Sequence, residues 1–243
     1  MIEDLVQKIP LDKAYDDLAS PALKEVGDML HNGVKSLRFL FAPIDILAKQ
    51  QDRLQNFLKR IDAKVDSDNL IDADPRIIGE TFEVLKYSKE DSILIELFIN
   101  LLAKSVDKTK QSKCHPAFPN IIRQLSPDEA VIIFYLKREK YELKNHSDFD
   151  VEKALFVNNT VIYNKFPLDK LNSPENFFIY MNHLNSLNLA GIWQRGNQVP
   201  IYNNNTQTGV DIYNEIRLTE FGMLFAEAVI PNNNIEIFSD IKS

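Results

Sequence analysis

The feature that most constrains this fold is a run of apolar residues at helical spacing in the first third of the chain. Positions from Leu37 to Val65 follow one another at alternating intervals of three and four residues, the heptad pattern of packed helices. Pro43 predicts a kink there, because proline removes a backbone donor. The pattern is compatible with pairing within the chain or with a second copy. The positions are Leu37, Leu40, Ile44, Leu47, Gln51, Leu54, Leu58, Ile61 and Val65.

Further helix signals fill the first half of the chain. There are only 7 glycines, where average usage of about 7% would give about 17, and helical domains use fewer turn glycines. Asp74-Pro75 reads as a helix start. The segment 90–106 is apolar nearly all round, which is typical of a helix surrounded by others. We therefore expect an N-terminal helical bundle over residues 1–125.

The remainder suggests a different domain. Ser126 opens a capping box with proline at the first helical position. We expect a short helix from Asp150, a small hairpin over 156–163 and a third helix over 174–189. A strand over 191–194, a polar loop over 195–211, a strand over 212–218 and a helix after Thr219 then follow. This order predicts a winged-helix-like α+β domain over 126–231 and a tail over 232–243, in a chain that is mostly α.

Charge and cysteine content narrow the class of protein. The net charge is −7 and no segment is strongly basic, so the electrostatic footprint of a nucleic-acid-binding protein is missing. A single cysteine and an acidic N-terminus without an apolar run favour a cytoplasmic protein. The apolar stretch 37–48 is interrupted by Arg38, Pro43 and Asp45, and a membrane span needs about 20 residues. We read it as core helix rather than as a membrane-binding surface.

The sequence contains no pattern that predicts catalysis. Cys114 and His115 are adjacent, and neighbouring side chains do not converge on a helix or strand, so we read them as a helix entry. The histidines lack metal-ligand spacing, and no glycine-rich phosphate loop occurs. The aspartates between positions 62 and 74 read as a solvated loop, without the glycine and glutamate of a calcium site. We therefore predict no catalytic residue, no metal and no cofactor.

The predicted third helix is the candidate contact surface. It carries Asn176, Asn182, His183 and Asn185 but no lysine or arginine. Proteins that read DNA first position their reading helix through several phosphate contacts. We therefore favour a protein partner for this helix over DNA.

Several segments resemble the abortive-infection alpha (Abi-alpha) family, which is named for phage exclusion in bacteria. They are SPALKEVGDML near residue 20, Ala42-Pro43, Asp74-Pro75 with Gly79, LFINLLAKSVDK, HPAFPNIIRQLSPDEA (115–130) and LTEFGMLF (218–225). The motif positions include His115, Pro116, Phe118, Leu125, Ser126, Asp128, Leu218, Thr219, Gly222 and Phe225.

The resemblance implies a defence context and no established catalytic site. We therefore expect a non-enzymatic bacterial antiphage protein that acts through protein–protein contacts. The alternatives are a winged-helix DNA-binding regulator and a membrane-acting effector that uses residues 37–48.

Overall fold

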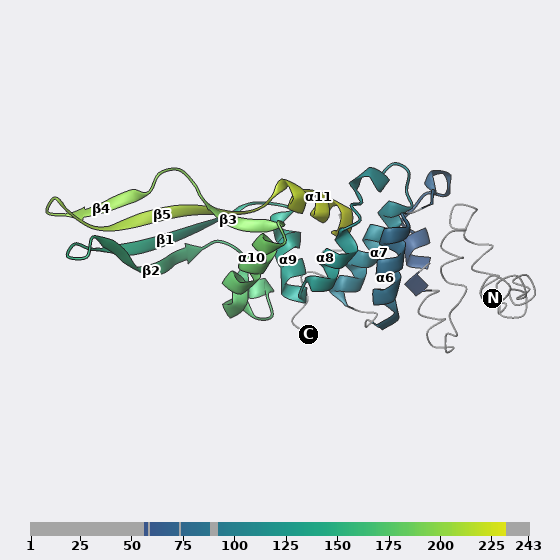
Figure 1. Ribbon diagram of the computed structural model, residues 1–243, viewed down its shortest axis with the longest axis horizontal. Helices are drawn as coiled ribbons and strands as arrows, with labels where there is room; N and C mark the ends of the chain where they lie inside the picture. The colour runs from purple at the N-terminus through teal and green to yellow at the C-terminus, as the bar shows by residue number, and fades with distance from the viewer. Residues whose placement is uncertain (1–55, 58, 73, 88–91, 232–243) are drawn as a thin grey trace, which may run out of the picture. The chain divides into compact units, whose positions relative to one another are not determined.

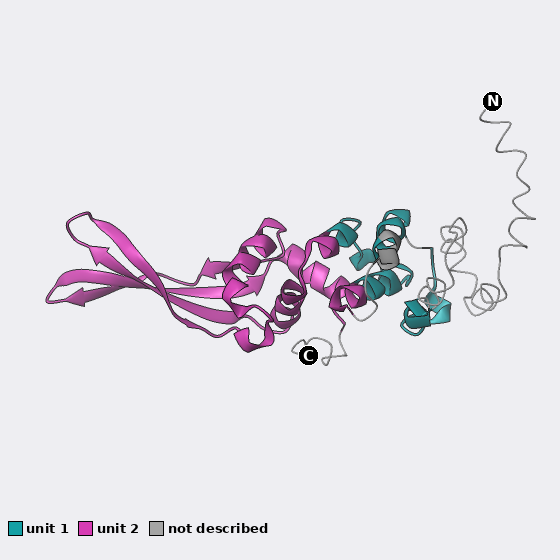
Figure 2. Cartoon of the chain, turned by 90° about the horizontal axis from the view of Figure 1, so that it is seen from below, with its two compact units in different colours: residues 1–91, 98–120 teal, residues 92–97, 121–243 magenta. Residues whose placement is uncertain are grey.

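The computed structural model describes residues 56–57, 59–72, 74–87 and 92–231. These residues, coloured along the chain in Figure 1, fall into two compact units (Figure 2). Those within 1–91 and 98–120 form the first unit, and those within 92–97 and 121–243 form the second. Most of the predicted apolar seam, including the stretch 37–48, lies outside the described residues, as does the tail 232–243. Within the described ranges, no helix has the length and apolar content needed to cross a bilayer.

The first unit contains α6 (Pro75–Tyr87) and most of α7 (Ile93–Ser105). The predicted helix start at Asp74-Pro75 is confirmed, and the Asp74 carboxylate accepts a hydrogen bond from the Arg76 backbone N–H at 2.9 Å. The chain before α6 is tied to the end of α7 by two backbone bonds, from the Ile71 N–H to the Val106 carbonyl and from the Lys108 N–H to the Asn69 carbonyl, each at 2.9 Å. The short helices η2 (Ser67–Asn69) and η3 (Gln111–Lys113) complete this unit with the start of α8 (Phe118–Gln124).

The second unit is built on a five-stranded antiparallel sheet. The strands are β1 (Tyr141–Asp150), β2 (Leu155–Asn164), β3 (Ala190–Gln194), β4 (Val199–Asn203) and β5 (Thr206–Leu218). Their order is β2-β1-β5-β3. The strand β4 pairs with the first half of β5, and β3 pairs with the second half. The helices are α9 (Pro127–Leu136), α10 (Phe177–Ser186) and α11 (Glu220–Val229), with the short helices η4 (Leu168–Lys170) and η5 (Pro174–Asn176) between β2 and α10.

The prediction of a mostly α chain with a winged-helix-like domain is wrong. A winged helix needs a second helix, and we expect it to begin at Asp150. The chain forms the β1–β2 hairpin there instead: Asp150 is the last residue of β1, and 151–153 lie in the turn. Charged or polar side chains occupy every second position from Glu142 to Asp150, which is the period of a strand with one solvated face. From the sequence alone we predict no strand over these residues.

The predicted polar loop over 195–211 is also wrong, because it contains β4 and the first half of β5. The turn between these strands consists of Asn204 and Asn205, with φ values of 47° and 65°. A two-residue hairpin loop with both residues at positive φ matches the twist of its strands, and asparagine tolerates that conformation. The asparagine run is therefore a turn signal. The expected strands over 191–194 and 212–218 are confirmed as β3 and the second half of β5.

The core of the second unit lies where the helices meet one end of the sheet. The Phe166 ring is at its centre, with its centroid 5.2 Å from that of Tyr141, 5.1 Å from that of Phe177 and 6.0 Å from that of Tyr135. Beyond this end, the β1–β2 and β4–β5 hairpins extend away from the helices (Figure 1). We call these two hairpins, residues 144–163 and 199–211, the arm.

Candidate functional site

One face of the sheet carries a ladder of charged side chains. On β1 it consists of Glu142, Lys144, His146 and Asp148, which share a face because successive side chains of a strand alternate. The register with β5 places Lys144 opposite Tyr213 and His146 opposite Asp211. The ladder therefore forms from two strands that lie more than sixty residues apart along the chain.

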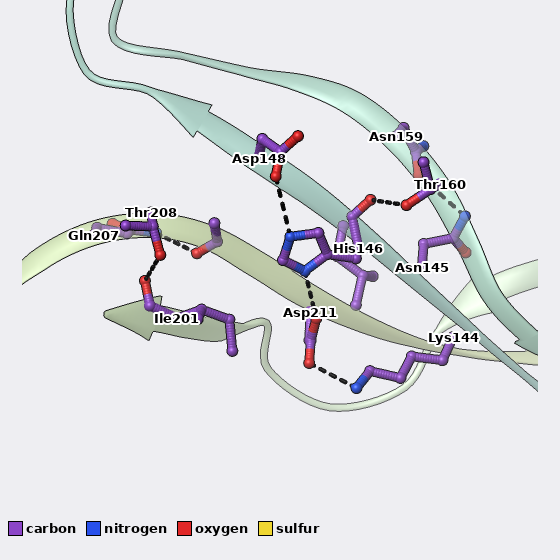
Figure 3. Close-up of polar contacts among 12 residues, drawn as sticks. Lys144, Asn145, His146, Asp148, Asn159, Thr160, Ile201, Gln207, Thr208 and Asp211 are labelled. Carbon is purple, nitrogen blue, oxygen red and sulfur yellow. Dashed lines mark hydrogen bonds and ion pairs between the residues drawn. The ribbon is translucent and has the colours of Figure 1, made fainter. Parts of the chain in front are cut away.

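Asp211 is the centre of the ladder on the arm (Figure 3). One carboxylate oxygen lies 2.6 Å from Lys144 Nζ, and the other lies 2.7 Å from His146 Nδ1. The hydrogen bonds to Lys144 and His146 hold the pKa of the Asp211 carboxyl below its usual value. In return, the hydrogen bond to Asp211 raises the pKa of Lys144 and that of His146.

The imidazole of His146 lies between two carboxylates. Its second ring nitrogen, Nε2, is 3.4 Å from Asp148 Oδ1. Two carboxylates favour the protonated ring, in which both nitrogens donate. A general base must instead be neutral and within reach of the proton that it removes. The arrangement is therefore better suited to joining β1 to β5 than to proton transfer.

Gly209 makes room for this cluster. A Cβ at this position would lie 2.8 Å from His146 Cε1 and 2.8 Å from the Ser147 carbonyl oxygen. The imidazole can cover β5 here only because the strand has no side chain at that position. Nearby, the hydroxyl of Thr208 donates to the Ile201 carbonyl at 3.4 Å, which ties β5 to β4 (Figure 3).

The ladder continues toward the helices. Glu142 accepts from Lys165 at 2.5 Å and from Arg195 at 3.2 Å, and the hydrogen bond to Lys165 is the main cause that lowers the Glu142 pKa. Lys140 and Arg217 each lie 3.2 Å from Glu215. These cations all have carboxylate partners, so the face does not present the unneutralised positive charge that a polyanion needs.

The arm also exposes large apolar side chains. Leu155 is 58% exposed, Ile162 54% and Tyr202 61%. Further exposed members are Val151, Phe156, Val161 and Val199. The Phe156 ring retains one partner, the ring of Phe149 on β1, at a centroid distance of 5.1 Å. Scattered surface apolar residues are ordinary, but the arm concentrates several large ones on its two edge strands and their turns.

The motif positions between His115 and Asp128 are buried or lie at the starts of helices. In the first unit, Phe118 is completely buried, and the Ala117 N–H donates to His115 Nδ1 at 3.1 Å, next to Pro116 at the entry to α8. In the second unit, Leu125 is buried and Ser126 begins α9 with the predicted capping box, which is confirmed.

Asp128 is buried and holds the loop before η5. Its carboxylate accepts from the Asn172 N–H at 2.9 Å, the Asn172 side-chain amide at 3.0 Å and the Ser173 N–H at 3.0 Å. A buried carboxylate is tolerated when such donors surround it.

The motif positions from Leu218 to Phe225 fix α11. Leu218 and Phe225 are buried, and Thr219 caps the helix by accepting a hydrogen bond from the Gly222 N–H at 2.8 Å, as predicted. A Cβ on Gly222 would lie 1.8 Å from the carbonyl oxygen of Leu189, so only glycine fits. These motif positions therefore specify how the chain folds.

The candidate contact residues lie on or beside α10. Asn176 ends η5 and precedes the helix, and Asn182 and Asn185 are exposed. His183 is turned toward α9, with Nδ1 2.6 Å from a carboxylate oxygen of Glu129. His183 is therefore partly engaged within the unit, whereas Asn182 and Asn185 are exposed.

Cys114 and His115 do not form an activated pair. Burial raises the pKa of the Cys114 thiol to about 11, and its Sγ lies 3.9 Å from the carbonyl oxygens of Leu101 and Lys110. A thiol in this state is protonated at neutral pH and is a poor nucleophile. Among the described residues, no three His, Cys, Asp or Glu side chains come together as metal ligands.

Sequence reasoning missed the cluster of Lys144, His146 and Asp211. The signal was available in part, because the alternation from Glu142 to Asp150 indicates a strand face. The partner Asp211 was not predictable, since it lies in the segment read as a loop.

Comparison with known proteins identifies the family of the chain. No curated protein and no solved structure matches it significantly. The family model described as "Abortive infection alpha" matches residues 49–229, which include the described strands and helices of the second unit. The chain belongs to the abortive infection alpha family.

Proposed function

We propose that this protein acts in antiphage defence by abortive infection, without an enzymatic step, through protein–protein contacts made by the arm. The family gives the defence context. The observation that carries the proposed mechanism is the group of large apolar side chains exposed on the β1–β2 and β4–β5 hairpins. Burying such side chains against a partner is the main driving force of protein association.

The charges on the arm support a protein partner over a nucleic acid. Lys144 is bound to Asp211, and Lys153 is paired with Asp150 at 3.1 Å. If the phosphates of a nucleic acid took over these lysines, Asp211 and Asp150 would lose their lysine partners. A protein surface, in contrast, can cover Leu155 and Tyr202 while the ion pairs stay intact.

The test is a plaquing assay with variants of exposed arm residues. Leu155→Lys and Tyr202→Lys place a charge on each hairpin at positions that are more than half exposed, so the fold should tolerate them. The matched control is Ile179→Lys on α10, which is 65% exposed and lies outside the arm. Each variant is expressed at native level with its neighbouring genes, and its folding is checked by circular dichroism.

We expect the wild type and Ile179→Lys to reduce plaquing relative to a deletion strain, and the two arm variants to plaque like the deletion. Wild-type cells that plaque a broad phage panel as efficiently as the deletion would refute the defence role. Arm variants that defend as well as the wild type would refute the arm as the contact surface.

A further inference from the structure

The outer edge of β2 is unlike the rest of the sheet. Within the described part of the chain, β2 pairs only with β1, so its other side presents unpaired backbone N–H and C=O groups (Figure 1). Its ten residues include no Asp, Glu, Lys, Arg, His or Pro. Charged residues and proline are the common means by which proteins prevent edge strands from pairing with other chains. This edge lacks both.

Side-chain hydrogen bonds to β1 hold β2 in place. Asn159 accepts a hydrogen bond from the side chain of Asn145 at 3.1 Å, and Asn158 donates to Asp148 at 3.0 Å. The hydroxyl of Thr160 donates to the His146 carbonyl at 3.4 Å. These contacts fasten the middle of β2 to β1. The pairing with β1 is irregular at two places, opposite His146–Asp148, where Asn158 has φ at 52°, and opposite Lys144–Asn145, within Val161–Tyr163.

The residue pattern of β2 is symmetric about that middle. Leu155–Val157 is apolar, 158–160 is polar and Val161–Tyr163 is apolar. An antiparallel two-fold pairing of two identical strands requires this kind of self-complementarity. It places Leu155–Val157 of one copy beside Val161–Tyr163 of the other, with the irregular Asn158 near the axis. Leu155, Phe156, Val161 and Ile162 are the exposed side chains that such pairing would cover.

The charges at the two ends of β2 favour the same orientation. The turn before β2 carries Asp150, Glu152 and Lys153, a net charge of −1, with Asp148 also exposed nearby. The other end carries Lys165, whose side chain is 60% exposed and is paired with Glu142, so this end is not net negative. Antiparallel pairing brings the acidic turn of one copy to Lys165 of the other, whereas parallel pairing would set the two acidic turns side by side.

We propose that β2 pairs antiparallel with β2 of a second copy, so that the two sheets become one continuous sheet across a two-fold axis. This inference deepens the proposed function, on which it rests for the use of the arm, by naming the partner of this edge. Main-chain hydrogen bonds supply the pairing, and the apolar side chains beside the axis supply the buried surface.

The first experiment measures the mass of the full chain in solution by sedimentation across a concentration series. The variant Val161→Lys/Ile162→Lys changes two exposed side chains of β2, and Val199→Lys is the matched control on the opposite edge of the arm. We expect a dimer for the wild type and for Val199→Lys. For the double variant we expect a dissociation constant raised at least about 100-fold, because the added ammonium groups of each copy would lie against the apolar Phe156 and Val157 of the other. A monomeric wild type at about 100 μM, or a double variant that still dimerises like the wild type, overturns the inference.

A second experiment tests the orientation. In a Cys114→Ala background, Phe156→Cys and Ile162→Cys proteins are mixed and treated with a short bifunctional thiol reagent. Cross-linking should be strong in the mixture and weak in either protein alone, because antiparallel pairing brings Phe156 of one copy opposite Ile162 of the other. Equal cross-linking of each protein with itself overturns the antiparallel arrangement.

The two proposals fail separately. A monomeric wild type whose arm variants still lose defence would refute the self-pairing and leave the arm as the surface for a different protein. A dimer that depends on β2 but gives no protection against phage would support the pairing and refute the defence function.

Discussion

The start of α11 packs against the backbone at the end of α10, and this contact allows a prediction about Gly222. Replacing Gly222 by alanine would put a methyl carbon 1.8 Å from the Leu189 carbonyl oxygen and 2.6 Å from the carbonyl carbon. Favourable non-bonded contacts lie near 3.5–4.0 Å, so backbone atoms must move by more than about 1 Å. The same carbonyl accepts from the Thr219 N–H at 2.9 Å, and the Thr219 hydroxyl donates to the neighbouring Asn188 carbonyl at 2.5 Å, so both bonds would be strained.

The magnitude follows from these contacts. Inserting a methyl group into a packed site costs about 1–3 kcal/mol. The two strained hydrogen bonds contribute about 1 kcal/mol each. Alanine regains about 1 kcal/mol in a helix relative to glycine. We therefore expect Gly222→Ala to lower the free energy of unfolding by about 3 kcal/mol, which for a chain of this size lowers Tm by about 6–12 °C.

The assay is urea unfolding followed by far-ultraviolet circular dichroism, with protein concentration held constant. The matched control is Gly79→Ala in α6, where the described residues place no heavy atom within 4 Å of an added Cβ. That substitution should stabilise the chain by about 0.5–1 kcal/mol through helix propensity alone. The same chemical change should thus have opposite signs at the two sites. A Gly222→Ala protein within about 1 kcal/mol of the wild type would refute the steric argument.

Three further outcomes follow from the side-chain contacts. Asp128→Asn should lower the free energy of unfolding by about 2 kcal/mol, because an amide N–H₂ would face backbone donors, while Asp169→Asn, 72% exposed, should leave it unchanged. By NMR titration the pKa of His146 should lie above 6.5 and fall in Asp211→Asn. The stabilisation by this pair is complete below pH 6.5 and lost as the pH rises through the folded-state pKa, so a benefit over His146→Gln that grew with pH would contradict it. At pH 8, Cys114 should react with Ellman's reagent far more slowly in the folded than in the unfolded chain, since its folded-state pKa is about 11; equal rates would show that the thiol is not protected.

Local sequence signals determined the starts of helices. The Ser126 capping box, the Asp74-Pro75 start and the Thr219 cap each depend on residues within a few positions of one another, and the structure contains all three. Such signals can be recognised in a single sequence because the hydrogen bonds they make are local.

The tertiary structure decided the fold class and the candidate site. Polar residues dominate both the β1 segment and residues 195–211, because few side chains of the arm are buried, and a strand with so little buried surface carries little of the apolar alternation that identifies it. The pairing of β1 with β5 then joins residues about seventy positions apart, and only this register brings Asp211 to Lys144 and His146. Which strand lies at the edge is likewise a property of the assembled sheet. The sequence by itself thus determined where these helices start, whereas the long-range pairing of strands placed the ladder and left β2 at the edge.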